Sequence, residues 1–180
     1  MNDKIIESYV VHYNPVIKQG VWRLKYYPES VVNGLIFNKR GDILLIRTDK
    51  WNDMLSLPGG HVEIGENLRN TVKREVSAQL GLDVEVKDML NVQEFIMPPD
   101  YYTRKHLILF NFACYSDKDD VALQYRHIKG HIWIRPEDAL CMNLEPYAME
   151  TLKTYIKTTE KTSSPGFSVA TTESNIKVRF

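Results

Sequence analysis

The segment from Gly60 to Leu82 carries the pattern that most constrains this chain. It reads Gly-x5-Glu-x7-Arg-Glu-Val-x-Ala-Gln-x-Gly-Leu. Within it, apolar residues recur at every fourth position, at Leu68, Val72, Val76 and Leu80. This spacing predicts an amphipathic helix that packs on a sheet, with Asn67 as its N-cap and Gly81 just after its end. The preceding Pro58 and two glycines predict a sharp turn, because proline lacks a backbone donor and glycine permits angles closed to other residues.

Extended segments flank this helix on both sides. A hairpin is expected from strands at 30–37 and 43–46, which a turn around Gly41 separates. Further apolar runs predict strands at 55–57, 82–86, 90–97, 106–115 and 132–134. Two segments that begin with proline, 136–140 and 146–156, predict helices. The fold class is therefore α/β (α+β), with a mixed sheet between flanking helices.

The composition indicates one globular domain. The chain has 180 residues, 43% of them hydrophobic, and its 23 Lys and Arg residues equal its 23 Asp and Glu residues. Generic binding to nucleic acid is disfavoured because there is no overall basic charge. No apolar run approaches the roughly 20 residues that span a bilayer, and the first residues lack a signal pattern, so a cytoplasmic protein is expected. Cys114 and Cys141 lack a Cys-x-x-Cys spacing and are expected to be reduced, buried thiols.

The two flanks differ from the body of the chain. Residues 1–29 are rich in Tyr and Val, and we expect an N-terminal extension packed on the domain. Residues 30–157 form the expected domain. In residues 158–180 Thr, Ser, Pro and Gly dominate, which predicts a mobile C-terminal tail.

Positions 75, 78 and 79 lie on one face of the predicted helix, because they stand in i, i+3, i+4 relation. Hard divalent cations prefer oxygen ligands, chiefly carboxylates. Glu75 offers a carboxylate and Gln79 a neutral carbonyl oxygen, whereas Ala78 offers no ligand.

The whole pattern resembles the Nudix box, Gly-x5-Glu-x7-Arg-Glu-U-x-Glu-Glu-x-Gly-U, in which U is a bulky aliphatic residue. Ala78 and Gln79 are the two departures, since the box has glutamates there. The resemblance extends to Leu57-Pro58-Gly59-Gly60, Glu63, Trp133 and the segment 136–140, and it covers residues 30–157. It implies a Nudix-like α/β/α sandwich with a mixed β-sheet and flanking helices.

The resemblance also implies roles for the matching residues. Glu75 is expected to be catalytic and to bind metal, and Glu66 to support the catalytic site from the start of the helix. Glu66 can equally be explained by its favourable interaction with the helix dipole. Arg74 is expected to position a box carboxylate, and Gly59 to shape the turn. With Glu75, a glycine carbonyl (Gly60 or Gly59) and Gln79 are expected to bind Mg²⁺ or Mn²⁺ weakly, with Glu63, Glu66 or Glu94 replacing the missing acids.

Four residues are candidates for binding substrate: Arg47, Glu94, Tyr101 and Tyr102. Glu94 occupies a position where many relatives place an acid near the cleft, although an outward-facing strand residue explains it as well. The two tyrosines could stack on a base, an interaction worth roughly 1–3 kcal/mol, or pack within their loop. The expected partner is a small nucleotide-type substrate, with no specific nucleic acid and no membrane. Homodimerisation is left open.

Two functions agree with these observations. The first is a metal-dependent Nudix-type hydrolase of low activity that cleaves a pyrophosphate linkage in a nucleoside diphosphate derivative. The intact remainder of the box supports it. The alternative is a catalytically impaired Nudix-fold module that binds nucleotides or proteins, which Ala78 and Gln79 support.

Overall fold

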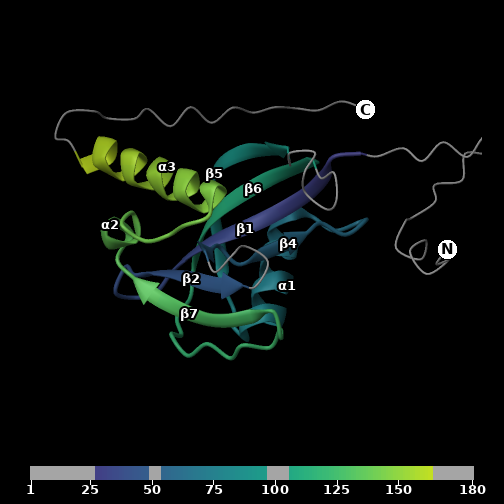
Figure 1. Cartoon of the computed structure of the whole chain (residues 1–180), viewed down its shortest axis with the longest axis horizontal. Helices are drawn as coiled ribbons and strands as arrows, with labels where there is room; N and C mark the ends of the chain where they lie inside the picture. The colour runs from purple at the N-terminus through teal and green to yellow at the C-terminus, as the bar shows by residue number, and fades with distance from the viewer. Residues whose placement is uncertain (1–26, 49–53, 97–105, 164–180) are drawn as a thin grey trace, which may run out of the picture.

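The computed structural model describes residues 27–48, 54–96 and 106–163. These residues form one mixed sheet with helices on both of its sides (Figure 1). The candidate substrate residues Tyr101 and Tyr102, nearly all of the expected N-terminal extension and most of the expected tail lie outside the described residues.

The sheet contains seven strands in these residues. They are β1 (Glu29–Phe37), β2 (Ile43–Thr48), β3 (Leu55–Ser56), β4 (Gly59–His61), β5 (Glu85–Ile96), β6 (His106–Tyr115) and β7 (Ile128–Ile134). The order is β3-β2-β1-β6-β5, while β4 also pairs with β1 and β7 with β2. Strands β1 and β6 run parallel and the other pairs antiparallel, so the predicted mixed sheet is confirmed.

The central helix α1 (Leu68–Leu80) has the predicted bounds. The Asn67 side chain accepts a hydrogen bond from the Asn70 amide at 2.9 Å, which satisfies one of the donors left open at a helix start. Gly81 follows the last turn with φ of 65°, a left-handed conformation that glycine adopts without steric cost.

Each side of the sheet has its own hydrophobic core. On one side, the α1 residues Val72, Val76 and Leu80 pack with Val32 and Ile36 of β1. Helices α2 (Pro136–Ala139) and α3 (Pro146–Ser163) lie on the other side, where α3 contributes buried residues such as Leu152. The predicted α/β/α sandwich is therefore confirmed (Figure 1).

The structure corrects several predicted boundaries. Residues 82–84 are not a strand; Leu82 and Val84 instead pack into the α1-side core directly after the helix cap. The predicted strands 82–86 and 90–97 are replaced by the single strand β5, whose pairing with β6 shifts register between Val86 and Asn91. Strand β7 begins at 128 rather than 132, and α3 continues seven residues past the predicted helix end at 156, to Ser163.

The two cysteines are free, as predicted, but only Cys114 is buried. Cys141 is exposed, because it lies in the turn that follows α2 and not in a core-facing helix. No helix in the described part of the chain is both long and apolar enough to cross a membrane.

Candidate functional site

Arg74 and Glu66 form the base of the candidate site. Arg74 Nε and Nη2 donate to the two carboxylate oxygens of Glu66, each at 2.9 Å, and Thr71 Oγ1 donates to Glu66 Oε2 at 2.9 Å. These hydrogen bonds, led by those from Arg74, lower the pKa of Glu66 to about 2. Glu66 is therefore an ionised anchor that orients the arginine.

The same arginine reaches Glu75 and the preceding turn. Arg74 Nη1 donates to Glu75 Oε1 at 2.6 Å, and Nη2 donates to the carbonyl of His61 at 3.1 Å. The hydrogen bonds to Glu66 and Glu75 raise the pKa of Arg74 further above its ordinary value. Arg74 thus links the start of α1, the middle of α1 and strand β4 through one planar group.

Gln79 occupies the opposite side of Glu75. Its amide nitrogen donates to Glu75 Oε2 at 2.8 Å and to the Gly59 carbonyl at 2.7 Å. A carboxylate and a carbonyl can only accept, so the nitrogen and not the oxygen of the amide must face them. The sequence predicts that the Gln79 carbonyl oxygen points at a cation. In the structure the amide nitrogen points instead at the Glu75 carboxylate and the Gly59 carbonyl.

The two glycines of the turn permit this close approach. A Cβ atom on Gly60 would lie 2.3 Å from Cδ of Glu75, and one on Gly59 would lie 2.0 Å from the Val32 carbonyl oxygen. Strand β4 pairs Gly59 with Asn33 and Gly60 with Val32 of β1. The absence of side chains therefore brings α1 and the sheet together at the position of Glu75.

These donors do not fit a resident divalent cation as they are arranged. Both oxygens of Glu75 and the Gly59 carbonyl already accept hydrogen bonds, and Ala78 supplies no oxygen. Glu63, a candidate replacement, is exposed and lies 4.0 Å from Arg74 Nη1. Within the described ranges, no group of three or more His, Cys, Asp or Glu residues is placed to hold a metal.

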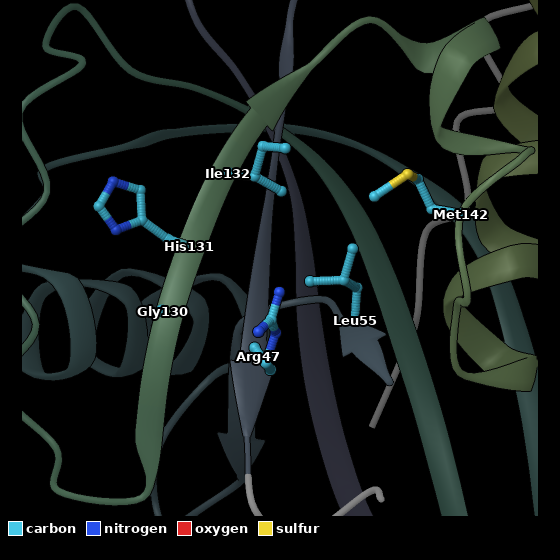
Figure 2. Close-up of a pocket in the computed structure, with 6 residues that line it drawn as sticks. All are labelled: Arg47, Leu55, Gly130, His131, Ile132 and Met142. Carbon is cyan, nitrogen blue, oxygen red and sulfur yellow. The ribbon is translucent and has the colours of Figure 1, made fainter. Parts of the chain in front are cut away.

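Arg47 lies in a pocket of about 240 Å³ at the edge formed by β2, β3 and β7. Leu55, Ile132, Met142, Gly130 and His131 also line it. Figure 2 shows Ile132 and His131 leaving β7 on opposite sides of the ribbon, as alternation along a strand requires. The chain runs from Leu55 in this pocket to Gly59 at the Glu75 cluster within four residues.

Glu94 is separate from both features. It lies on β5, and its Oε1 atom is 2.8 Å from His106 Nε2. Both side chains are substantially exposed, so this is a surface pair between neighbouring strands. Binding of substrate by Glu94 stays a prediction.

Sequence reasoning brought together the residues that form the cluster but missed Thr71 in the cluster and Met142 in the Arg47 pocket. Thr71 binds Glu66 from one turn into α1, and its five-residue spacing from Glu66 was the available signal. Met142 lines the Arg47 pocket from the segment between α2 and α3. No sequence pattern indicated it, because its position depends on long-range packing.

A buried acid lies outside the cluster. Glu145 is 1% exposed, its Oε2 atom has no hydrogen-bond partner among the described residues, and its backbone amide donates to the Leu55 carbonyl. Burial raises the pKa of Glu145 to about 7. The neutral acid is therefore favoured in the folded protein more than in the unfolded chain.

Comparison with known proteins places this geometry in a family context. The model of the NUDIX domain matches residues 28–156. An ADP-ribose pyrophosphatase of Methanocaldococcus jannaschii is 37% identical over 93 residues, covering 51% of this chain and 53% of that protein. The NAD-capped RNA hydrolase NudC of Shigella flexneri is 26% identical over 118 residues, covering 64% of this chain and 43% of that protein. The chain spans about half the length of the curated relatives it matches.

Solved structures agree with the family match. The MutT protein from Methanosarcina mazei Go1 superposes with a TM-score of 0.65 at 28% identity, over 77% of this chain and 99% of that one. A C. elegans Ap4A hydrolase superposes with a TM-score of 0.59, over 74% of this chain and 98% of that one. Its identity is 16%, so this likeness concerns the fold alone.

Proposed function

The chain belongs to the Nudix family, and from this premise we propose that it is a slow hydrolase of a pyrophosphate linkage in a nucleoside diphosphate derivative. The observation that carries the proposal is the Glu66–Arg74–Glu75 network packed against the Gly59-Gly60 turn. It holds the largely buried Glu75 carboxylate in one orientation, and each of its oxygens keeps a lone pair that can accept a proton from attacking water.

In this proposal each residue of the site has a separate role. Glu75 is the candidate catalytic carboxylate, Glu66 and Arg74 orient it, and Arg47 with its pocket receives part of the nucleotide. At about 240 Å³ the pocket is smaller than the roughly 300–1,000 Å³ of ordinary ligand sites, so it suits a base or a sugar rather than a whole nucleotide. Arginine there would also pair with a phosphate oxygen.

Low turnover is part of the proposal. Ala78 and Gln79 remove two of the carboxylates found in the box, and the remaining donors are bonded to protein groups. Mg²⁺ or Mn²⁺ belongs to this proposal only as a weakly bound ion. ADP-ribose is the first substrate to test, because a relative named for its hydrolysis matches half of this chain.

The experiment measures release of nucleoside monophosphate by chromatography. The full chain is incubated with ADP-ribose, a dinucleotide, a nucleotide sugar or a nucleoside triphosphate, with and without Mg²⁺ or Mn²⁺. We expect slow cleavage of at least one diphosphate derivative and loss of that activity in Glu75→Gln. Lys73→Ala, which changes an exposed residue of α1, is the matched control and should keep the wild-type rate.

A second function is favoured by one observation. Gln79 bonds both Gly59 and Glu75, and a site closed in this way could bind a nucleotide without cleaving it. Calorimetry with the same compounds distinguishes the two functions. Binding without any product would replace the hydrolase with a nucleotide-binding module.

A further inference from the structure

The Gln79 amide lies between two oxygen atoms that cannot bond to each other. Its nitrogen is 2.7 Å from the Gly59 carbonyl oxygen and 2.8 Å from Glu75 Oε2. The carboxylate oxygen is negatively charged, the carbonyl oxygen carries a partial negative charge, and both only accept hydrogen bonds, so a donor or a cation must lie between them.

The hydrogen bonds from Gln79 to Glu75 and Gly59 are buried, so water cannot readily replace them. Gln79 is 5% exposed and the Glu75 side chain 12% exposed, so water has little access to their contact. A buried acceptor that loses its donor destabilises the fold, and the loss is larger if the acceptor is charged. The site therefore depends on what occupies position 79.

We propose that the Gln79 carboxamide substitutes for a divalent cation, so that the folded site needs no cation to hold Glu75 against the Gly59 carbonyl. The amide supplies two N–H donors at the position where a glutamate would add a second carboxylate beside Glu75 and the carbonyl oxygen. A glutamate there would have to recruit a cation to relieve the repulsion. The inference rests on the proposed function only for its location at the candidate active site.

The test measures thermal unfolding without nucleotide, in EDTA and in about 10 mM MgCl₂ at matched ionic strength. For wild type we expect the melting temperature to change by less than about 1 °C. For Gln79→Glu we expect a lower melting temperature in EDTA and a rise of about 4 °C with Mg²⁺, the shift that a millimolar site gives in a chain of this size. Ser77→Glu adds the same charge at an exposed position of α1 and should not respond.

Three results would overturn the inference. They are a Mg²⁺ response of wild type equal to that of Gln79→Glu, no response of Gln79→Glu, and an equal response of Ser77→Glu. If Gln79→Glu does not fold, titration of wild type with Mn²⁺, followed by the electron paramagnetic resonance of the free ion, decides the question. No binding up to about 1 mM supports the inference, and a dissociation constant clearly below 1 mM contradicts it.

Because these measurements contain no substrate, their outcome is independent of the turnover assay. A chain that ignores Mg²⁺ in the melting experiment and still cleaves ADP-ribose would support both proposals. A chain that binds Mn²⁺ tightly and cleaves nothing would contradict both, each through its own measurement.

Discussion

Arg74 and Glu66 face each other through two parallel hydrogen bonds of 2.9 Å, eight residues apart across the start of α1. This bidentate geometry fixes the plane of the guanidinium, which leaves Nη1 directed at Glu75. A lysine could neutralise the same charge but could not hold both carboxylates in a fixed geometry.

The first prediction concerns the acid stability that this pair provides. The pKa of Glu66 is about 2 in the folded protein against 4.5 ordinarily, so its stabilisation is present above pH 4.5 and lost as the pH falls toward 2. We expect Glu66→Gln to flatten the pH dependence of the unfolding free energy over this range. Urea unfolding followed by circular dichroism at several pH values measures it. Asp88→Asn, which changes an exposed acid on β5, should leave the slope as it is.

The second prediction separates the two glycines of the turn. An added methyl group at Gly59 meets the Val32 backbone, whereas one at Gly60 meets the Glu75 side chain. We expect Gly59→Ala to lose about 3 kcal/mol of stability and Gly60→Ala about 1 kcal/mol. Gly60→Ala should nevertheless lose about 100-fold in turnover, because it displaces the candidate catalytic carboxylate.

Urea unfolding and the ADP-ribose assay measure these two effects. Gly130→Ala is the control for stability, since its added methyl group meets no atom within 4 Å. Equal loss of stability in the Gly59 and Gly60 variants would contradict the distinction between backbone and side-chain contacts.

The third prediction concerns Glu145, whose pKa is raised whereas that of Glu66 is lowered. Burial raises the pKa of Glu145 from 4.5 to about 7, so its relative stabilisation is present below pH 4.5 and lost as the pH rises through 7. The full loss is on the order of 3 kcal/mol. We expect Glu145→Gln, which stays neutral, to remove this decline between pH 5 and 8 in urea unfolding. A decline that persists in the variant would assign it to another group.

The sequence was sufficient to predict the local parts of this fold. The fourfold spacing from Leu68 to Leu80, the Asn67 cap and Gly81 each act within a few residues, and α1 has the predicted bounds. The resemblance to the box also brought Glu66, Arg74 and Glu75 together; Glu66 precedes α1, and the long arginine side chain joins it to Glu75. Strand boundaries near 82–97 were less predictable, since pairing with β6 and core burial decide which residues extend.

The sequence could not predict which end of the Gln79 amide faces Glu75. That choice depends on the Gly59 carbonyl, which a turn twenty residues earlier brings into contact with α1. Likewise, the Arg47 pocket requires β7 and Met142, both distant in sequence from β2. Long-range contacts of this kind leave no local periodicity to read.

The last prediction rebuilds the acids of the box with Ala78→Glu and Gln79→Glu together. Both positions share one helix face with Glu75, so three carboxylates would face the Gly59 carbonyl once the amide is removed. We expect tighter Mg²⁺ binding, lower stability in EDTA because the acids repel, and an increase of about 100-fold or more in cleavage of ADP-ribose.

The control Asn70→Glu with Ser77→Glu adds the same charge on the exposed face of α1. Calorimetry and chromatography at equal Mg²⁺ measure both effects. An unchanged rate in a double variant that folds and binds Mg²⁺ would show that the cleft lacks more than two acids, and would favour the binding module over the hydrolase.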